Sequence, residues 1–268
     1  MEHITKLGVF DSGLGGLTVL DEICKYNNGL SISYFGDTAR VPYGSRTPET
    51  IARYAEQDVR FLLSCGVEAI VIACGTVSAT CLDRLKKRYR IPIVGVIEPA
   101  AEAAAIETKT RHIGVLGTRA TIHSNAYSNQ IHSIDPDCRV TGIACPLFVP
   151  LIENGLTGSD PITQLTLERY LKPILDTDID TLILGCTHYP FLKEAIAAFL
   201  PGVTLINTGT ALAKALPQLF SVVSDTERTE NSLSYFVSDT DSEFQSIANS
   251  RLDCIRAENV QKINIELY

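Results

Sequence analysis

Residues 181–190, TLILGCTHYP, place an unbroken apolar run before Cys186, and His188 follows two residues later. The run shows no alternation of apolar and polar side chains. Such runs are typical of parallel strands that helices cover on both faces. The stretch therefore predicts an α/β architecture in which Cys186 and His188 lie at the end of a buried strand.

Similar apolar runs recur along the chain: LGVF (7–10), ISYF (32–35), AIVIA (69–73) and HIGVLG (112–117). Amphipathic stretches such as 17–26 and 48–65 separate them, and Thr47 before Pro48 predicts a helix cap and a first helical residue. This order predicts mainly parallel sheets flanked by helices. We also expect strands at 139–144 and 203–206, helices at 120–131, 161–172, 190–200 and 210–219, and a last strand and helix after the polar stretch 224–231.

The two halves of this pattern can be laid over each other. GVFDSG at residue 8 matches GVLGTR at residue 114, and VIACGT around Cys74 matches LILGCT around Cys186. Matches in the same order suggest an internal duplication. We therefore expect two similar α/β domains, related by a pseudo-two-fold axis around a central cleft. Residues 1–97 with 208–268 would form the first domain, and residues 98–207 the second.

Composition narrows the classes of function. The 268 residues are 45% hydrophobic and 20% charged, as in a globular protein, and the net charge is −8. A chain of this net charge is not expected to bind nucleic acid as its main partner. It has no apolar span of 18 residues, and its start, MEHITKLGVFDSG, lacks the features of a signal peptide. We expect a cytoplasmic protein without a membrane segment.

The eight cysteines are too sparse for a disulfide scaffold, and none has the C-x-x-C spacing of zinc or redox sites. We therefore expect no metal. Six of them suit packing in the interior. Cys74 and Cys186 differ because each follows an apolar strand at an equivalent position in the two halves. A cysteine just before a helix is expected to have a lowered pKa, because the helix dipole favours the thiolate.

Ligands of parallel α/β sheets bind beyond the carboxyl ends of the strands. Two thiols that face one carbon there can remove a proton from one side and return one to the other, which inverts a stereocentre without a cofactor. Asp11 and His188 are candidate proton partners, one in each half. Glu153, in PLFVPLIENG, is either a further partner or a solvated loop acid.

The glycines of DSGLGGL offer a different interpretation. Gly13, Gly15 and Thr18 match most of the G-x-G-x-x-G fingerprint of dinucleotide sites, and Asp37 ends the next strand about twenty residues later. The last glycine of the fingerprint is replaced by Thr18, and both strand-end cysteines would have no role. Nucleotide binding therefore ranks below a site built on the two thiols.

Several motifs in this order resemble those of cofactor-independent glutamate racemases: GVFDSGLGGLTVL, YFGDTARVPYGSRTPETI, GVIEPA, GVLGTRATI, PLFVPLIE and LGCTHYPFL. The likeness runs from Leu7 to Leu192. It implies two α/β domains around a cleft, no cofactor, interconversion of L- and D-glutamate, and a supply of D-glutamate for peptidoglycan synthesis. A homodimer is common among such enzymes.

The resemblance also implies roles for individual residues. Cys74 would deprotonate D-glutamate and Cys186 L-glutamate, with Asp11 and His188 assisting and Glu153 a further candidate. The positions expected to contact substrate are Asp11, Ser12, Pro42, Tyr43, Gly44, Gly75, Thr76, Thr118, Thr121, Thr187 and His188.

The chain departs from the family pattern at Gly75, where the family usually carries an asparagine that contacts the substrate. A lost buried hydrogen bond costs about 1–3 kcal/mol. This departure keeps two alternatives open: a racemase of aspartate or another small amino acid, and a protein that binds a small acid without turnover. Asn207 and Thr210 also stand where the family more often has acids, and we have no mechanistic account of that difference.

Overall fold

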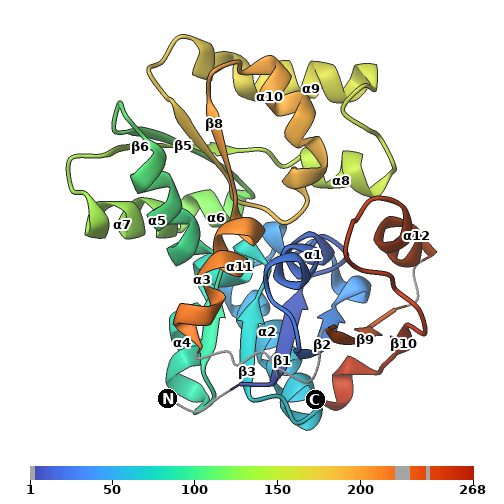
Figure 1. The fold of residues 1–268 in the computed structure, drawn as a ribbon. Helices are drawn as coiled ribbons and strands as arrows, with labels where there is room; N and C mark the ends of the chain where they lie inside the picture. Colours follow the sequence, from blue (N-terminus) through green and yellow to red (C-terminus); the bar gives the residue numbers. More distant parts are fainter. Residues whose placement is uncertain (1–3, 221–229, 240–241) are drawn as a thin grey trace.

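The computed structural model describes residues 4–220, 230–239 and 242–268 and contains two parallel β-sheets (Figure 1). Over these residues the first sheet has the order β10-β9-β2-β1-β3-β4 and the second β6-β5-β7-β8. The strands of the first sheet are β1 (Lys6–Asp11), β2 (Ser31–Gly36), β3 (Ala69–Ile72), β4 (Ile93–Gly95), β9 (Ser232–Val237) and β10 (Gln261–Lys262). Those of the second are β5 (His112–Gly117), β6 (Arg139–Ala144), β7 (Thr181–Leu184) and β8 (Thr204–Asn207).

Helices lie on both faces of each sheet, as the unbroken apolar runs predicted. The α-helices are α1 (Leu17–Tyr26), α2 (Pro48–Ser64), α3 (Gly75–Thr80), α4 (Leu82–Arg88), α5 (Ile97–Glu107), α6 (Arg119–His123), α7 (Ala126–Ile134), α8 (Phe148–Glu153), α9 (Pro161–Leu175), α10 (Lys193–Phe199), α11 (Thr208–Leu219) and α12 (Ser242–Ser250). Short 3-10 helices are η1 (Thr38–Arg40), η2 (Tyr43–Ser45), η3 (Tyr189–Leu192) and η4 (Ile265–Leu267).

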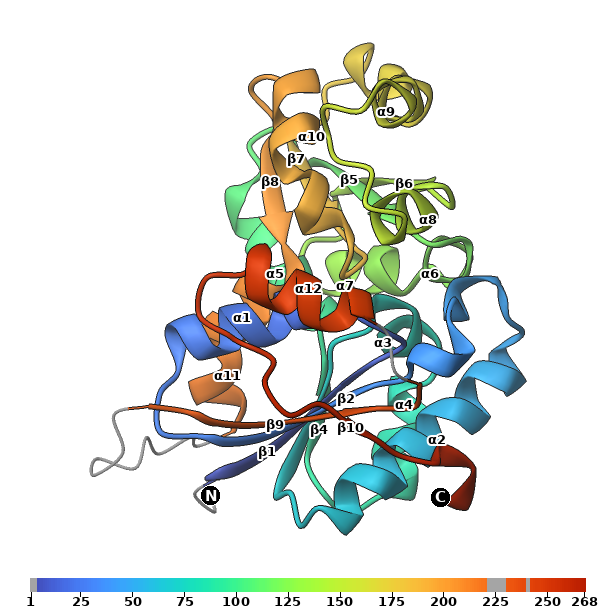
Figure 2. The same cartoon turned by 90° about the vertical axis from the view of Figure 1, so that its right-hand side faces the viewer.

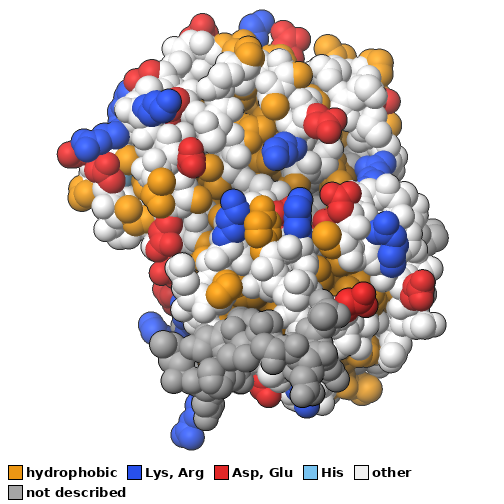
Figure 3. Space-filling model, viewed as in Figure 1, with side chains coloured by type: hydrophobic (Ala, Val, Ile, Leu, Met, Phe, Trp, Pro, Cys, Tyr) orange, Lys and Arg blue, Asp and Glu red, His pale blue; other side chains and the backbone are white. Residues whose placement is uncertain are grey.

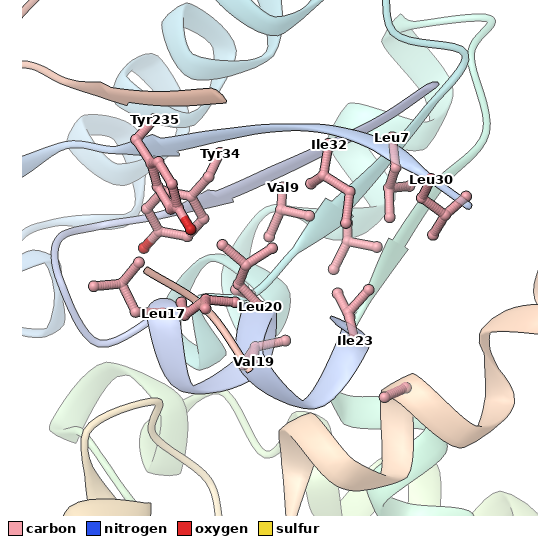
Figure 4. Packing of buried hydrophobic residues seen from close by; sticks show 14 of the residues in the cluster. Leu7, Val9, Leu17, Val19, Leu20, Ile23, Leu30, Ile32, Tyr34 and Tyr235 are labelled. Atoms are coloured by element: carbon pink, nitrogen blue, oxygen red, sulfur yellow. The ribbon is translucent and has the colours of Figure 1, made fainter. Parts of the chain in front are cut away.

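Alternate residues of each strand enter different cores. In β1, Leu7 and Val9 pack against α1 and α11, whereas Phe10 joins the core under α2. Figure 4 shows Leu20 of α1 among the side chains of β1 and β2. Because both faces are covered, both sets of side chains must be apolar, which removes the period-two pattern of a strand with one wet face.

The two sheets share a connection pattern. β1 lies between β2 and β3 and β5 lies between β6 and β7, while β4 and β8 are each added beyond the strand that precedes the cysteine turn. After the second sheet the chain returns, and β9 pairs with β2. The domain boundaries at 97/98 and 207/208 and the pseudo-two-fold relation stay predictions.

Local differences from the predicted elements have physical causes. The helix expected at 120–131 is two helices, α6 and α7, because Asn125 adopts a left-handed conformation with φ of 56°. The helix expected at 190–200 begins as the 3-10 helix η3 and becomes α-helical only at Lys193. The polar stretch 224–231 lies mostly outside the described residues. Thr47 does cap α2 by accepting a hydrogen bond from the Thr50 N–H, with Pro48 next.

The structure can be checked for membrane-spanning helices and for clusters of positive charge on its surface. Among the described residues no helix is both apolar and long enough to cross a bilayer. On the face drawn in Figure 3, Lys and Arg side chains stand among acidic and uncharged ones rather than in one continuous basic area.

The packing of α1 on the sheet provides a stability test. Leu20 is fully buried, so Leu20→Ala should lower the free energy of unfolding by about 2–5 kcal/mol in urea denaturation. Leu165→Ala removes the same atoms from a side chain on α9 that is 69% exposed. It should change the free energy of unfolding by no more than about 0.5 kcal/mol. Equal losses in the two variants would contradict this account of the core.

Candidate active site

The carboxyl ends of the two sheets meet between the domains. Asp11 ends β1, Cys74 follows β3, Thr118 follows β5 and Cys186 follows β7. Hydrogen bonds cross the boundary: Thr187 donates through Oγ1 to Asp11 Oδ1 at 3.3 Å, and Thr18 Oγ1 donates to the Thr187 carbonyl at 2.8 Å. The strand-end residues predicted from the sequence therefore lie at one interdomain contact.

The turns that carry the two cysteines touch each other. Gly75 lies so close to the Gly185 carbonyl that a Cβ added at Gly75 would overlap its oxygen, and that Cβ would be 3.9 Å from Cys186 Cα. Only a residue without a side chain fits position 75 in this arrangement.

Cys74 is the N-cap residue of α3, and its side chain is buried. Its Sγ donates a hydrogen bond to Ser12 Oγ at 3.4 Å. Burial, and then the Asp11 carboxylate, raise the pKa of Cys74 to about 12. The expectation of a pKa lowered by the helix start is wrong for this thiol, because removal from water outweighs the dipole of a six-residue helix.

Cys186 is bordered by a buried histidine. Its Sγ lies 4.0 Å from His188 Nδ1, and His188 Nε2 lies 3.0 Å from Glu153 Oε1. Burial lowers the pKa of His188, but hydrogen bonds to Cys186 and Glu153 and their charges raise it to about 10. His188 is therefore an imidazolium at neutral pH, held between the sulfur and the carboxylate. Cys186 is followed by the 3-10 helix η3.

Asp11 is fully buried beside these groups. Burial raises its pKa, while the positive charge of His188 acts in the opposite direction. Its Oδ2 accepts a hydrogen bond from the Gly13 N–H at 3.0 Å. Gly16 is the N-cap residue of α1, and its backbone N–H also hydrogen-bonds to Asp11. Gly15 has no room for a Cβ, because the His188 ring lies directly against it.

Threonines form a second bridge between the domains. Thr118 Oγ1 lies 3.0 Å from Thr76 Oγ1 and 3.0 Å from Thr121 Oγ1. Gly44 packs against them, since a Cβ added there would be 2.7 Å from Thr118 Cβ. Hydroxyls that share hydrogen bonds with one another can exchange these bonds for bonds to a polar ligand.

Two residues that were predicted to contact substrate, Pro42 and Tyr43, differ from the cysteines and threonines in where their side chains lie. Pro42 is exposed. Tyr43 is buried, and its hydroxyl donates to Asp37 and, at 3.2 Å, to Asp58 Oδ2. Its side chain is thus occupied inside the first domain, and only its backbone is available for a ligand. Asp37 is also paired with Arg40 at 2.6 Å, which leaves the ribose-binding role of the nucleotide hypothesis unsupported.

Sequence reasoning missed Gly185 and the buried group behind Tyr43. Gly185 lies in the opening motif, but nothing in the sequence indicates that it faces Gly75. Asp58 lies on α2, fully buried, and its pKa is raised well above its usual value by burial and then by Asp37. A charged residue on the inner face of an amphipathic helix was the available signal. Among the described residues no cluster of His, Cys, Asp and Glu has a metal-binding arrangement.

The proton on His188 can be titrated. In NMR titrations the imidazole signals of His188 should change at about pH 10, and Glu153→Gln should move the change to lower pH by removing an anion that stabilises the imidazolium. The control, Glu168→Gln, removes an exposed acid paired with Lys172. Because this pKa lies above its usual 6.5, the protonated ring contributes stability below about pH 6.5 that is lost as the pH rises through about 10. An unchanged titration in Glu153→Gln would contradict the assignment.

Comparison with known proteins supplies independent evidence. Residues 20–216 match the model of the Asp/Glu/hydantoin racemase family. A glutamate racemase from Sulfurihydrogenibium sp. (strain YO3AOP1) is 40% identical over 256 residues, which cover 95% of this chain and 96% of the relative.

Solved structures agree. Glutamate racemase isoform RacE1 from Bacillus anthracis superposes with a TM-score of 0.89 at 36% identity, covering 97% of both chains. Glutamate racemase from Francisella tularensis, solved in complex with D-glutamate, gives a TM-score of 0.87 at 36% identity and 98% coverage of both chains. The chain therefore belongs to the Asp/Glu/hydantoin racemase family and, within it, to the glutamate racemases.

Proposed function

We propose that this chain interconverts L- and D-glutamate by proton exchange between the α-carbon of the substrate and the thiols of Cys74 and Cys186. The observation that carries the proposal is the direct contact between the two cysteine turns, Gly75 against Gly185, at the ends of two facing sheets. Two bases on opposite walls of one small site can remove a proton from one face of a carbon and return one to the other, which inverts it.

The surroundings of the thiols differ in a way that suits one acid and one base. Cys74, with a pKa of about 12, is a thiol at neutral pH and can donate a proton. Cys186 lies beside the His188 imidazolium, which pairs with it when it is a thiolate. From L-glutamate, Cys186 takes the α-proton and Cys74 delivers one to the opposite face. The reverse reaction exchanges these roles.

Other site residues bind and orient the substrate in this proposal. The hydroxyls of Ser12, Thr76, Thr118, Thr121 and Thr187 supply hydrogen bonds, and the backbone of residues 42–44 and of Gly75 supplies N–H groups. Asp11 acts with the first thiol, and Glu153 acts through His188. These groups stabilise the carbanion-like species by fixed dipoles in a site that excludes water.

The names of the relatives support glutamate as substrate, and the Francisella tularensis enzyme was solved with D-glutamate. Aspartate or another small acid as substrate and binding without turnover are not favoured by these relatives. The product D-glutamate would serve peptidoglycan synthesis. We further propose a cytoplasmic location, since all eight cysteines are free and the mechanism needs reduced thiols. We also propose a homodimer, which is common among the enzymes that the chain resembles.

Incubation with L-glutamate in D2O, followed by chiral chromatography and mass spectrometry, tests the mechanism. The D-glutamate formed should carry deuterium at its α-carbon. Cys74→Ser and Cys186→Ser should each lower kcat by at least about 100-fold, because one face then lacks a base of suitable strength. Cys65→Ser, at the half-buried C-cap of α2 and away from the two cysteine turns, should retain activity. Product without solvent label would refute exchange through the thiols.

Gly75 gives a prediction opposite to the family pattern. Gly75→Ala and Gly75→Asn should both lower kcat by at least about tenfold, because the added Cβ overlaps the Gly185 oxygen and pushes the cysteine turns apart. Gly202→Asn is the control, at an open site with a φ of 88° that asparagine tolerates. Wild-type or higher activity in Gly75→Asn would show that the close backbone contact is not needed.

A further inference from the structure

A basic pocket lies on the seam between the domains, outside the threonine bridge. It has a volume of about 410 Å³, within the range of small-molecule sites. The first domain contributes Gly44, Arg46 and Thr80, and α6 of the second contributes Arg119 and His123. Figure 2 shows the segment between β2 and α2 reaching up beside α6, where these residues meet.

The charge of the pocket is not balanced from within. Its lining includes two guanidinium groups and an imidazole but no Asp or Glu. Among the described residues neither Arg46 nor Arg119 forms an ion pair, and both side chains are exposed. The pocket on α9 differs, because Arg169 and Lys172 share it with Glu168 and Asp176. In a chain of net charge −8, the seam pocket is therefore a local site for an anion.

The pocket is also connected to Cys74 through the short helix α3. Thr80, in its wall, ends the helix α3 that begins just after Cys74, and six residues at 1.5 Å each span about 9 Å. Gly44 forms both the wall of the pocket and the contact with Thr118. Gly44 therefore lies between the pocket and the threonine bridge.

We propose that the pocket formed around Arg46, Arg119 and His123 is the entrance of the cleft and binds a carboxylate of the substrate before it reaches the thiols. This inference rests on the proposed function. Guanidinium groups bind carboxylates in a paired geometry, and a positive entrance raises the local concentration of an anion that the rest of the protein repels. Because Arg46 and Arg119 belong to different domains, a bound carboxylate also bridges them.

Steady-state kinetics with L-glutamate test the proposal. Arg46→Glu and Arg119→Glu should each raise KM about three- to tenfold at low ionic strength while kcat stays within about twofold, since the residues do not touch the reacting atoms. Arg46→Gln and Arg119→Gln should give smaller increases. Arg90→Glu, just before the amino end of β4 and thus on the opposite edge of the sheet, makes the same charge change and should leave KM unchanged.

Salt dependence separates the entrance from a site for another anion. In the wild type, kcat/KM should fall as the NaCl concentration rises. In the double variant Arg46→Glu with Arg119→Glu, this fall should disappear or reverse. Wild-type KM and salt dependence in the charge variants would overturn the inference while leaving the racemase assignment intact. If instead only inhibition or activation by added sulfate is lost, the pocket binds a different anion and the inference is also wrong. A wild type without racemisation would refute the proposed function itself.

Discussion

The structure depends on a backbone contact between two turns, Gly75 of one domain and the Gly185 carbonyl of the other. Each turn follows a buried parallel strand, so its position is set by a sheet with helices on both faces. Close-packed cores of this kind have low compressibility, so they hold the strand ends in fixed positions. The absence of side chains at the contact lets two rigid layers bring their strand ends together, and the cysteines beside these glycines are carried to the same place.

The two halves of the site share a backbone plan but differ in electrostatics. Cys74 has a hydroxyl and the Asp11 carboxylate as neighbours, whereas Cys186 has the His188 imidazolium and, behind it, Glu153. Two thiols with identical surroundings would prefer the same protonation state. Racemisation needs one thiolate that accepts the α-proton of the substrate and one thiol that donates a proton to it. In the proposed mechanism, the different neighbours of the two thiols favour an acid on one side of the substrate and a base on the other.

Features that depend on neighbouring residues could be predicted from the sequence, whereas contacts between residues distant in the sequence could not. The strands other than β4 and β10, and most helices, were predictable because burial on both faces leaves an unbroken apolar run. The order of motifs indicated where polar residues gather. The break at Asn125 was not, because a left-handed asparagine carries no distinct pattern. Gly75 against Gly185 and the Tyr43 hydroxyl bound to Asp58 join residues distant in sequence, so only the folded chain reveals them.

The position of Cys74 between a strand and a helix is not enough to predict the pKa of its thiol. An interaction with a helix terminus is worth about 0.3–1 kcal/mol, and α3 has only six residues. A pKa moved from 9.0 to about 12 corresponds to about 4 kcal/mol against the thiolate, and burial is its largest cause. Desolvation therefore decides the resting state. The same burial keeps Cys74 protonated, which is the state that the proposed mechanism requires of the group that returns a proton to the substrate.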